Sequence, residues 1–140
     1  MNTSEVYLKS LTIRDNLKIV ADIQGNQIDI TLQPIKPYLV SDKVSLIIIG
    51  QDPTIKNIKV RDKITHTLNL DKKGALRNYI SEICKGLELN LENVYATNVF
   101  KYFYTIPPAQ TIHVLKAHLQ PNLELLKSQI ALYPEAKIIT

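Results

Sequence analysis

The sequence has a single cysteine, Cys84, among its 140 residues. One cysteine cannot form an internal disulfide, and one thiol can neither cage a metal ion nor supply the four ligands of an iron–sulfur cluster. No apolar run approaches the roughly 20 residues that a membrane-spanning helix requires. The first ten residues lack the basic-then-apolar pattern of a secretory signal. We therefore expect a metal-free protein of the reducing cytoplasm, with no membrane partner.

The composition is that of one folded domain. The chain is 45% hydrophobic and 21% charged, and a chain of this length can bury a real core. Its net charge of +4 is unevenly spread. The stretch 55–77 sets two acidic residues against seven basic ones, which are Lys56, Lys59, Arg61, Lys63, Lys72, Lys73 and Arg77. This basic cluster favours a polyanionic partner, and a solvated lysine-rich loop is the alternative.

From residue 44 the apolar pattern alternates between strand and helix. "VSLIIIG" (44–50) is a β-branched run typical of a strand buried on both faces, and "NVYATNV" (93–99) is a second. Apolar spacings of three and four residues predict helices over 76–87 and 112–130, and Pro121 should kink the latter or open another helix. "AKIIT" (136–140) begins a third strand. The predicted fold class is α/β, an open parallel-type sheet with flanking helices.

The first forty residues are less regular, and we interpret them as an extension of, or an addition to, an α/β core at 44–140. No firm period runs through residues 5–20. "DIQGNQIDITL" (22–32) suggests two short strands around a Gly25–Asn26 turn. "ITHTLNL" (64–70) suggests a short strand or an extended segment.

Two polar residues follow strands at positions where function concentrates. Asp52 comes directly after the strand that ends at Gly50, and Asn98 ends the next strand. Ligands of open α/β sheets gather at the carboxyl ends of the strands. We therefore expect Asp52 and Asn98 to lie together, although each could instead be a helix cap or a turn residue.

The joint pattern resembles the uracil-DNA glycosylase superfamily. "IIIGQDPT" (47–54) is similar to the family's first motif, a strand followed by Gly-Gln-Asp-Pro. "GLELNLENVYATNVFKYFYTIPP" (86–108) is similar to its second region, and "HLQPNLELLKSQIALYPEAKII" (118–139) to the helix that leads to its third strand. The resemblance implies a DNA-repair enzyme, a monomeric glycosidase without a cofactor, that hydrolyses the N-glycosidic bond of uracil or a related base in DNA.

The resemblance also implies a role for each motif residue. Asp52 would direct the attacking water and stabilise the cationic sugar, and Asn98 would pair with the edge of a flipped uracil. The other substrate-binding candidates are Gln51, Pro53, Thr54 and His66, and the DNA-binding candidates are Lys56, Lys59, Arg61, Lys63 and Lys101. Tyr102 and Tyr104 could stack on unpaired bases, whereas Phe100 is expected to pack the loop onto the sheet.

The sequence departs from the family in three places. Thr54 and Ile55 stand where the best-known branch has Tyr-His, which could loosen the discrimination against thymine or mark another substrate. His66 is the one candidate for stacking on the base in 65–70, and it could also be a loop residue without a role. The family's further strand with a His-Pro-Ser type segment is not found before Thr140, and His113 and His118, on the preceding helix, do not substitute for it.

Two functions from different classes are therefore expected, and a generic α/β domain that handles another small molecule is a third alternative. The first is a glycosylase that is incomplete at its C-terminus in this chain. The second is a catalytically inert nucleic-acid or nucleotide-binding domain that retains the fold.

Overall fold

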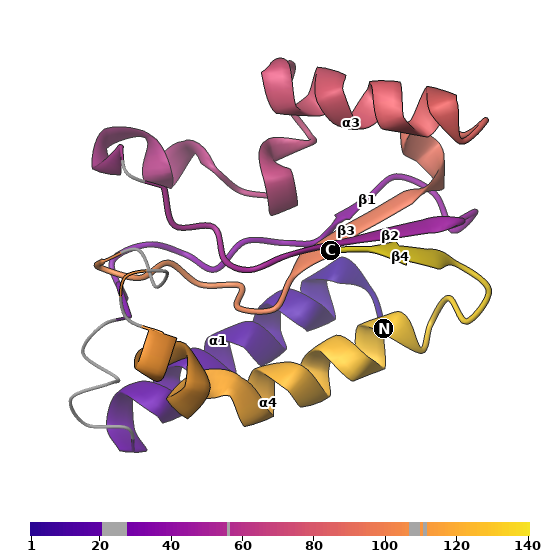
Figure 1. Cartoon of the computed structure of the whole chain (residues 1–140). Helices are drawn as coiled ribbons and strands as arrows, with labels where there is room; N and C mark the ends of the chain where they lie inside the picture. The colour runs from indigo at the N-terminus through magenta and orange to yellow at the C-terminus, as the bar shows by residue number, and fades with distance from the viewer. Residues whose placement is uncertain (21–27, 56, 107–109, 111) are drawn as a thin grey trace.

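The computed structural model describes residues 1–20, 28–55, 57–106, 110 and 112–140. The described residues form three layers, in which a central sheet lies between helix α3 (Ala75–Gly86) above and helices α1 (Thr3–Val20) and α4 (Ile112–Ile130) below (Figure 1). The chain is a mixed α/β fold, as the alternation of strand and helix patterns predicted. The Gly25–Asn26 turn proposed from the sequence lies outside the described residues.

The sheet has four strands in the order β1-β3-β2-β4. Strands β2 (Leu46–Gly50), β3 (Val94–Asn98) and β4 (Lys137–Ile139) are mutually parallel, as predicted. Strand β1 (Tyr38–Leu39) pairs antiparallel with β3, so the sheet is mixed rather than wholly parallel. The antiparallel strand was not predicted, because two residues are too few to show a strand period.

The two faces of the sheet have different cores because side chains alternate along a strand. Leu46 and Ile48, with Val94 and Ala96, pack beneath α3 (Ala75–Gly86) against Ile80 and Cys84. The other face carries Tyr95 and Thr97, whose hydroxyls both accept hydrogen bonds from Gln129 of α4 (Ile112–Ile130). Helix α4 continues through Pro121 as one helix, so no second helix opens there.

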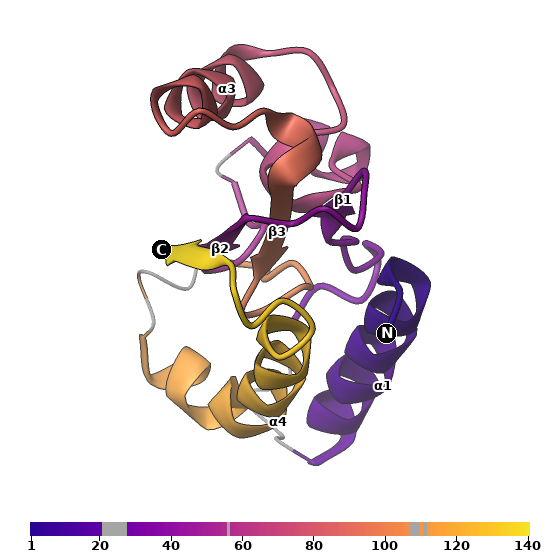
Figure 2. The ribbon, with the colours of Figure 1, turned by 90° about the vertical axis from the view of Figure 1, so that its right-hand side faces the viewer.

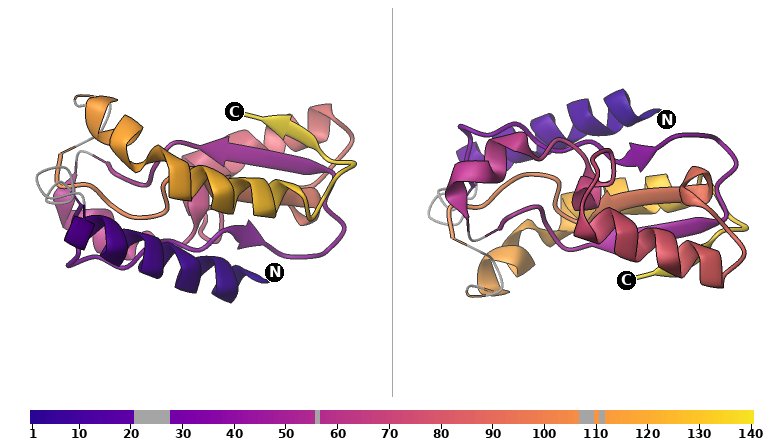
Figure 3. Two further views of the ribbon diagram at one scale, coloured as in Figure 1. Left: turned by 90° about the horizontal axis from the view of Figure 1, so that it is seen from below. Right: turned by 90° about the horizontal axis from the view of Figure 1, so that it is seen from above.

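Residues 3–20 form a helix, α1 (Thr3–Val20), where the sequence showed no firm period. Helix α1 lies beside α4 below the sheet (Figures 2 and 3). Its stability therefore comes from tertiary packing: it contacts α4, and its residues Val6, Ser10 and Arg14 are buried. The residues before 40 thus complete the lower helical layer and supply one edge strand.

Candidate functional site

The register of β2 and β3 places the two motif segments side by side. Gly50 is paired with Asn98 at the carboxyl ends of both strands. The pairing continues beyond them, because the amides of Val99 and Phe100 donate to the carbonyls of Gly50 and Gln51 at 2.9 Å each. The segment that carries Asp52 therefore leaves the sheet alongside the segment that follows Asn98, as the sequence predicted.

The Asp52 carboxylate is held in a turn of its own loop. Its Oδ1 accepts from the Thr54 amide at 2.9 Å, and its Oδ2 accepts from the Gln51 side chain at 2.9 Å. Asp52 is half-buried, and no helix begins at it, so it is not an N-cap. Two donors therefore fix the direction of a carboxylate that is only partly buried.

Asn98 presents an unpaired hydrogen-bond acceptor inside the protein. Its side chain is 3% exposed, and its Oδ1 has no hydrogen-bond partner among the described residues. A buried acceptor without a partner costs about 1–3 kcal/mol, so its retention calls for an explanation such as a ligand. The Oδ1 lies 3.2 Å from the point where a Cβ on Gly50 would stand. A glycine at position 50 therefore lets the amide sit directly against the neighbouring strand.

A second unpaired polar atom lies in the segment that packs beside β3. The 3-10 helix Thr67–Asn69 contacts β3 and occupies the α3 side of the sheet. Thr67 is 1% exposed, and its Oγ1 has no partner within the described part of the chain. By strand alternation Asn98 faces this same side. The sequence suggested an extended segment here and gave no sign of Thr67, because a threonine in a loop is uninformative until its burial is known.

The backbone of this 3-10 helix is strained. Leu68 and Asn69 adopt left-handed conformations, with φ of 56° and 54°. A left-handed residue other than glycine costs about 1–2 kcal/mol, and such strain concentrates at functional sites. The strained segment and the unpaired Thr67 hydroxyl thus pack on β3, the strand whose carboxyl end carries the unpaired Asn98 acceptor.

Several other predicted residues act as links between the loops. The Thr54 hydroxyl oxygen accepts from the Tyr104 amide at 2.9 Å, and Pro53 is buried. Arg61 is 3% exposed, and its guanidinium donates to the carbonyls of Ile55 and Tyr104 at 2.7 and 3.1 Å. Arg61 thus ties the loop after Asp52 to the loop after Asn98, and it does not face solvent as a phosphate contact requires.

Lys101 is also inside the protein. It is 1% exposed, and its Nζ donates to the Asn98 carbonyl at 2.5 Å. Burial lowers the pKa of Lys101 to about 7, because the charged form loses its hydration. The prediction that Lys101 lies on a DNA-facing surface is therefore wrong, and its amine instead holds the end of β3.

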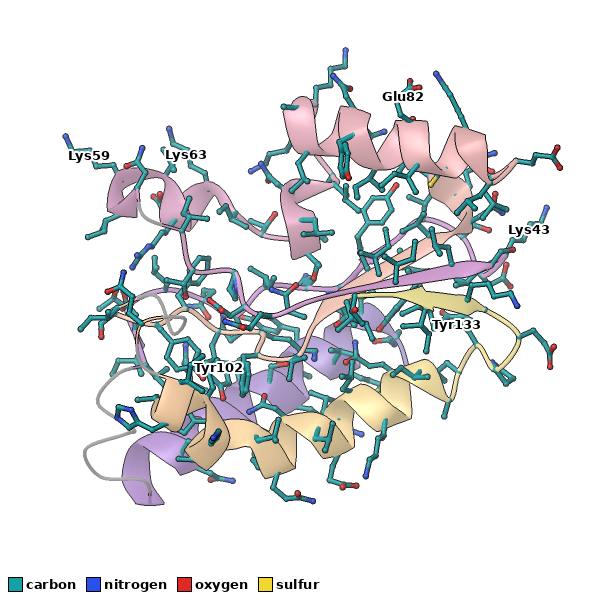
Figure 4. The ribbon with its side chains drawn as sticks, viewed as in Figure 1. Lys43, Lys59, Lys63, Glu82, Tyr102 and Tyr133 are labelled. Carbon is teal, nitrogen blue, oxygen red and sulfur yellow. The ribbon has the colours of Figure 1, made fainter. Side chains whose placement is uncertain are left out.

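The aromatic residues that follow are core. Tyr102 and Tyr104 are 0% and 1% exposed, so they do not present faces on which unpaired bases could stack (Figure 4 labels Tyr102). Phe100 packs in the same cluster, as expected. Burial raises the pKa of Tyr102 to about 12 and also raises that of Tyr104. The Tyr104 hydroxyl lies 3.0 Å from Nδ1 of His118, which is fully buried rather than on the helix surface; His113 is exposed.

The exposed part of the basic cluster lies at the same end of the molecule as the site. Lys59 and Lys63, on the 3-10 helix Ile58–Lys63, project from the end toward which β2, β3 and β4 run (Figure 4). Lys43, which precedes β2, lies at the opposite end. Lys56 lies outside the described residues. His66 is half-buried, with Nδ1 3.2 Å from Asp71 and 2.9 Å from the Thr65 hydroxyl.

Comparisons with models of protein families, with curated proteins and with solved structures gave no match for this chain. Two further features concern the described residues. They contain no group of three His, Cys, Asp or Glu side chains placed to hold a metal ion. They also contain no helix long and apolar enough to cross a membrane.

Proposed function

We propose that this chain is a uracil-DNA glycosylase-like domain that hydrolyses the N-glycosidic bond of uracil, or of a related base, in DNA. One observation carries the proposal. Asp52 and Asn98 leave adjacent parallel strands at the same edge, and the Asn98 acceptor is buried without a partner. A uracil N3–H would supply the donor that this acceptor lacks.

The chemistry assigns one role to each side chain. The base must leave the stack to reach a buried amide, so the substrate is a flipped or single-stranded nucleotide. As the bond from C1′ to the base breaks, its electron pair leaves with the base and the sugar becomes cationic. The Asp52 carboxylate stabilises that cation and takes a proton from the water that attacks C1′. The hydrogen bonds from Gln51 and Thr54 hold the carboxylate in one orientation throughout.

The exposed lysines would make the contact with DNA. Lys59 and Lys63 would hold phosphates at the edge where the site opens. Arg61 and Lys101 have no part in this contact, because both are buried and bonded to backbone carbonyls. In this proposal they organise the loops that carry Asp52 and Asn98.

The test is release of uracil from a single-stranded oligonucleotide that contains one deoxyuridine, detected by alkaline cleavage at the abasic site. Asp52→Asn keeps an Oδ1 acceptor for the Thr54 amide, and it should lower the rate about 100-fold or more. Asp42→Asn is the matched control, since Asp42 is an exposed carboxylate before β2. Equal activity of Asp52→Asn and the control would refute the mechanism, and DNA binding without base release would favour the inert binding domain.

Thr67→Val tests a role of Thr67 in the site without disturbing the stability of the fold. Valine matches threonine in shape, and the Thr67 hydroxyl has no partner to lose among the described residues. We expect unchanged or higher stability, because the fold loses no hydrogen bond. We also expect slower uracil release, because the Thr67 hydroxyl would hydrogen-bond to the bound base. Unchanged release would remove Thr67 from the site.

A further inference from the structure

A cavity of about 620 Å³ lies beside the candidate site and does not include Asp52 or Asn98. It opens between α1, the segment 31–36 and the segment 61–66. Leu32, Pro34, Ile64 and Phe103 give its walls an apolar part, and polar and charged residues, among them Lys36, Asp62 and His66, line the rest. This volume is in the range of small-molecule sites, which run to roughly 300–1,000 Å³.

The cavity carries a cation without a carboxylate partner. Lys36 has no carboxylate within ion-pair distance in the described residues, and its Nζ lies 5.7 Å from the centre of the Tyr7 ring. The backbone of Lys36 is fixed, because its amide donates to Thr65 and its carbonyl accepts from Thr67 at 2.8 and 3.0 Å. A partly buried lysine without a carboxylate partner, anchored through its backbone beside a cavity, attracts an anion.

Polar groups at the rim of the cavity could form hydrogen bonds with the edge of a ring in a ligand. The Tyr7 hydroxyl donates to Oε1 of Gln33 at 2.7 Å, which leaves the Gln33 amide hydrogens for a ligand. His66 also lines the cavity, and its Nδ1 faces Thr65 and Asp71, so Nε2 is the nitrogen left for a ligand. Apolar walls with a few placed polar groups suit a flat heterocycle that carries its own donors and acceptors.

The basic 3-10 helix Ile58–Lys63 adjoins the cavity. Arg61 and Asp62 of that helix line the cavity, and Lys59 and Lys63 of the same helix are exposed. A ligand with a ring for the cavity and an anionic group for Lys36, with further anionic groups for the basic helix, is one unit of a polyanionic strand.

We propose that this cavity binds a mononucleotide unit, with its phosphate on Lys36 and its base between the apolar walls. The proposal is independent of the proposed function, because neither Asp52 nor Asn98 takes part in it. The same unit could arrive as a free nucleotide or as part of single-stranded DNA, and the experiment separates these two sources.

The experiment is calorimetric titration of the full chain with four probes: thymidine monophosphate, thymidine, inorganic phosphate and a ten-residue oligothymidylate. Thymidine monophosphate should bind at least about tenfold more tightly than thymidine or phosphate, since tenfold corresponds to one modest interaction of 1.4 kcal/mol. Tight binding of the oligonucleotide alone identifies a strand as the source, and tight binding of the monophosphate alone identifies a free nucleotide. Failure of both to bind at millimolar concentration overturns the proposal, as does equal affinity for phosphate alone.

Two variants locate the binding. Lys36→Met should weaken binding of the nucleotide unit about tenfold, and Lys36→Arg should restore most of it. Lys43→Met is the matched control, an exposed lysine at the far end of the molecule. Thermal melting of each variant checks that the fold is kept. Equal affinity of folded Lys36→Met and Lys43→Met would overturn the assignment of this cavity.

Discussion

Lys101 gives the prediction with the clearest magnitude, because it is a lysine buried without a carboxylate. Its folded-state pKa is about 7 against 10.5 for an exposed lysine. Between these values the unfolded chain binds the proton and the folded chain does not. The free energy of unfolding should therefore rise as pH rises through 7, and the gain should level off near 10.5.

The size of the effect follows from the same two values. Where the unfolded chain binds one proton more than the folded chain, the free energy of unfolding rises by about 1.36 kcal/mol for each pH unit. At pH 7 the folded lysine is still half protonated. From pH 7 to pH 9 Lys101 should therefore add about 2 kcal/mol to the free energy of unfolding. Below pH 7 both states hold the proton, so the contribution becomes constant.

The assay is urea unfolding of wild type and Lys101→Met at pH 7, 8 and 9, followed by circular dichroism. Other titrating groups are common to both proteins, so the difference between them isolates Lys101. We expect this difference to grow by about 2 kcal/mol in favour of the wild type across that range. Lys43→Met, which removes an exposed lysine, should show a difference that does not change with pH. A constant difference for Lys101→Met would refute the burial of its amine.

Two further predictions concern the site and the basic cluster. A Cβ at position 50 would meet the Asn98 Oδ1 at 3.2 Å, so Gly50→Ala and Asn98→Ala should be coupled by about 1 kcal/mol in a double-mutant cycle of unfolding free energies; additive effects would contradict the close approach of the two strands. Replacing both Lys59 and Lys63 with Gln should reduce the slope of log affinity for single-stranded DNA against log salt by about 1.4, or about 0.7 for each phosphate contact. Lys43→Gln should leave the slope unchanged, and an unchanged slope in the double variant would exclude these lysines from the DNA contact.

The sequence was most informative for elements whose own residue pattern shows which face is buried. The β-branched run 46–50 and the three- and four-residue spacing in 76–87 predicted β2 and α3, because each pattern reports a face that must be buried. The parallel pairing of β2 with β3 then brought Asp52 and Asn98 to one edge, as expected.

The sequence was least informative where burial depends on a distant partner. Lys101 follows Asn98 in a segment that reads as a basic, aromatic loop, yet it is buried and its carbonyl accepts from the amide of Ile35, which is distant in sequence. His118 is placed by the sequence only on a helix, yet it is fully buried with its Nδ1 3.0 Å from the hydroxyl of Tyr104 in another segment. The cavity beside Lys36 needs α1, which showed no firm period, and two separate loops. No local pattern can report such assemblies.

The central claim is that Asp52 and Asn98 form one base-excision site, and uracil release is the measurement that tests it most directly. The full chain is incubated with a single-stranded oligonucleotide that contains one deoxyuridine, next to its Asp52→Asn and Asp42→Asn variants. We expect free uracil from the wild type and Asp42→Asn, and a rate lower by about 100-fold or more from Asp52→Asn. No uracil from the wild type, or equal release from all three proteins, would contradict the account.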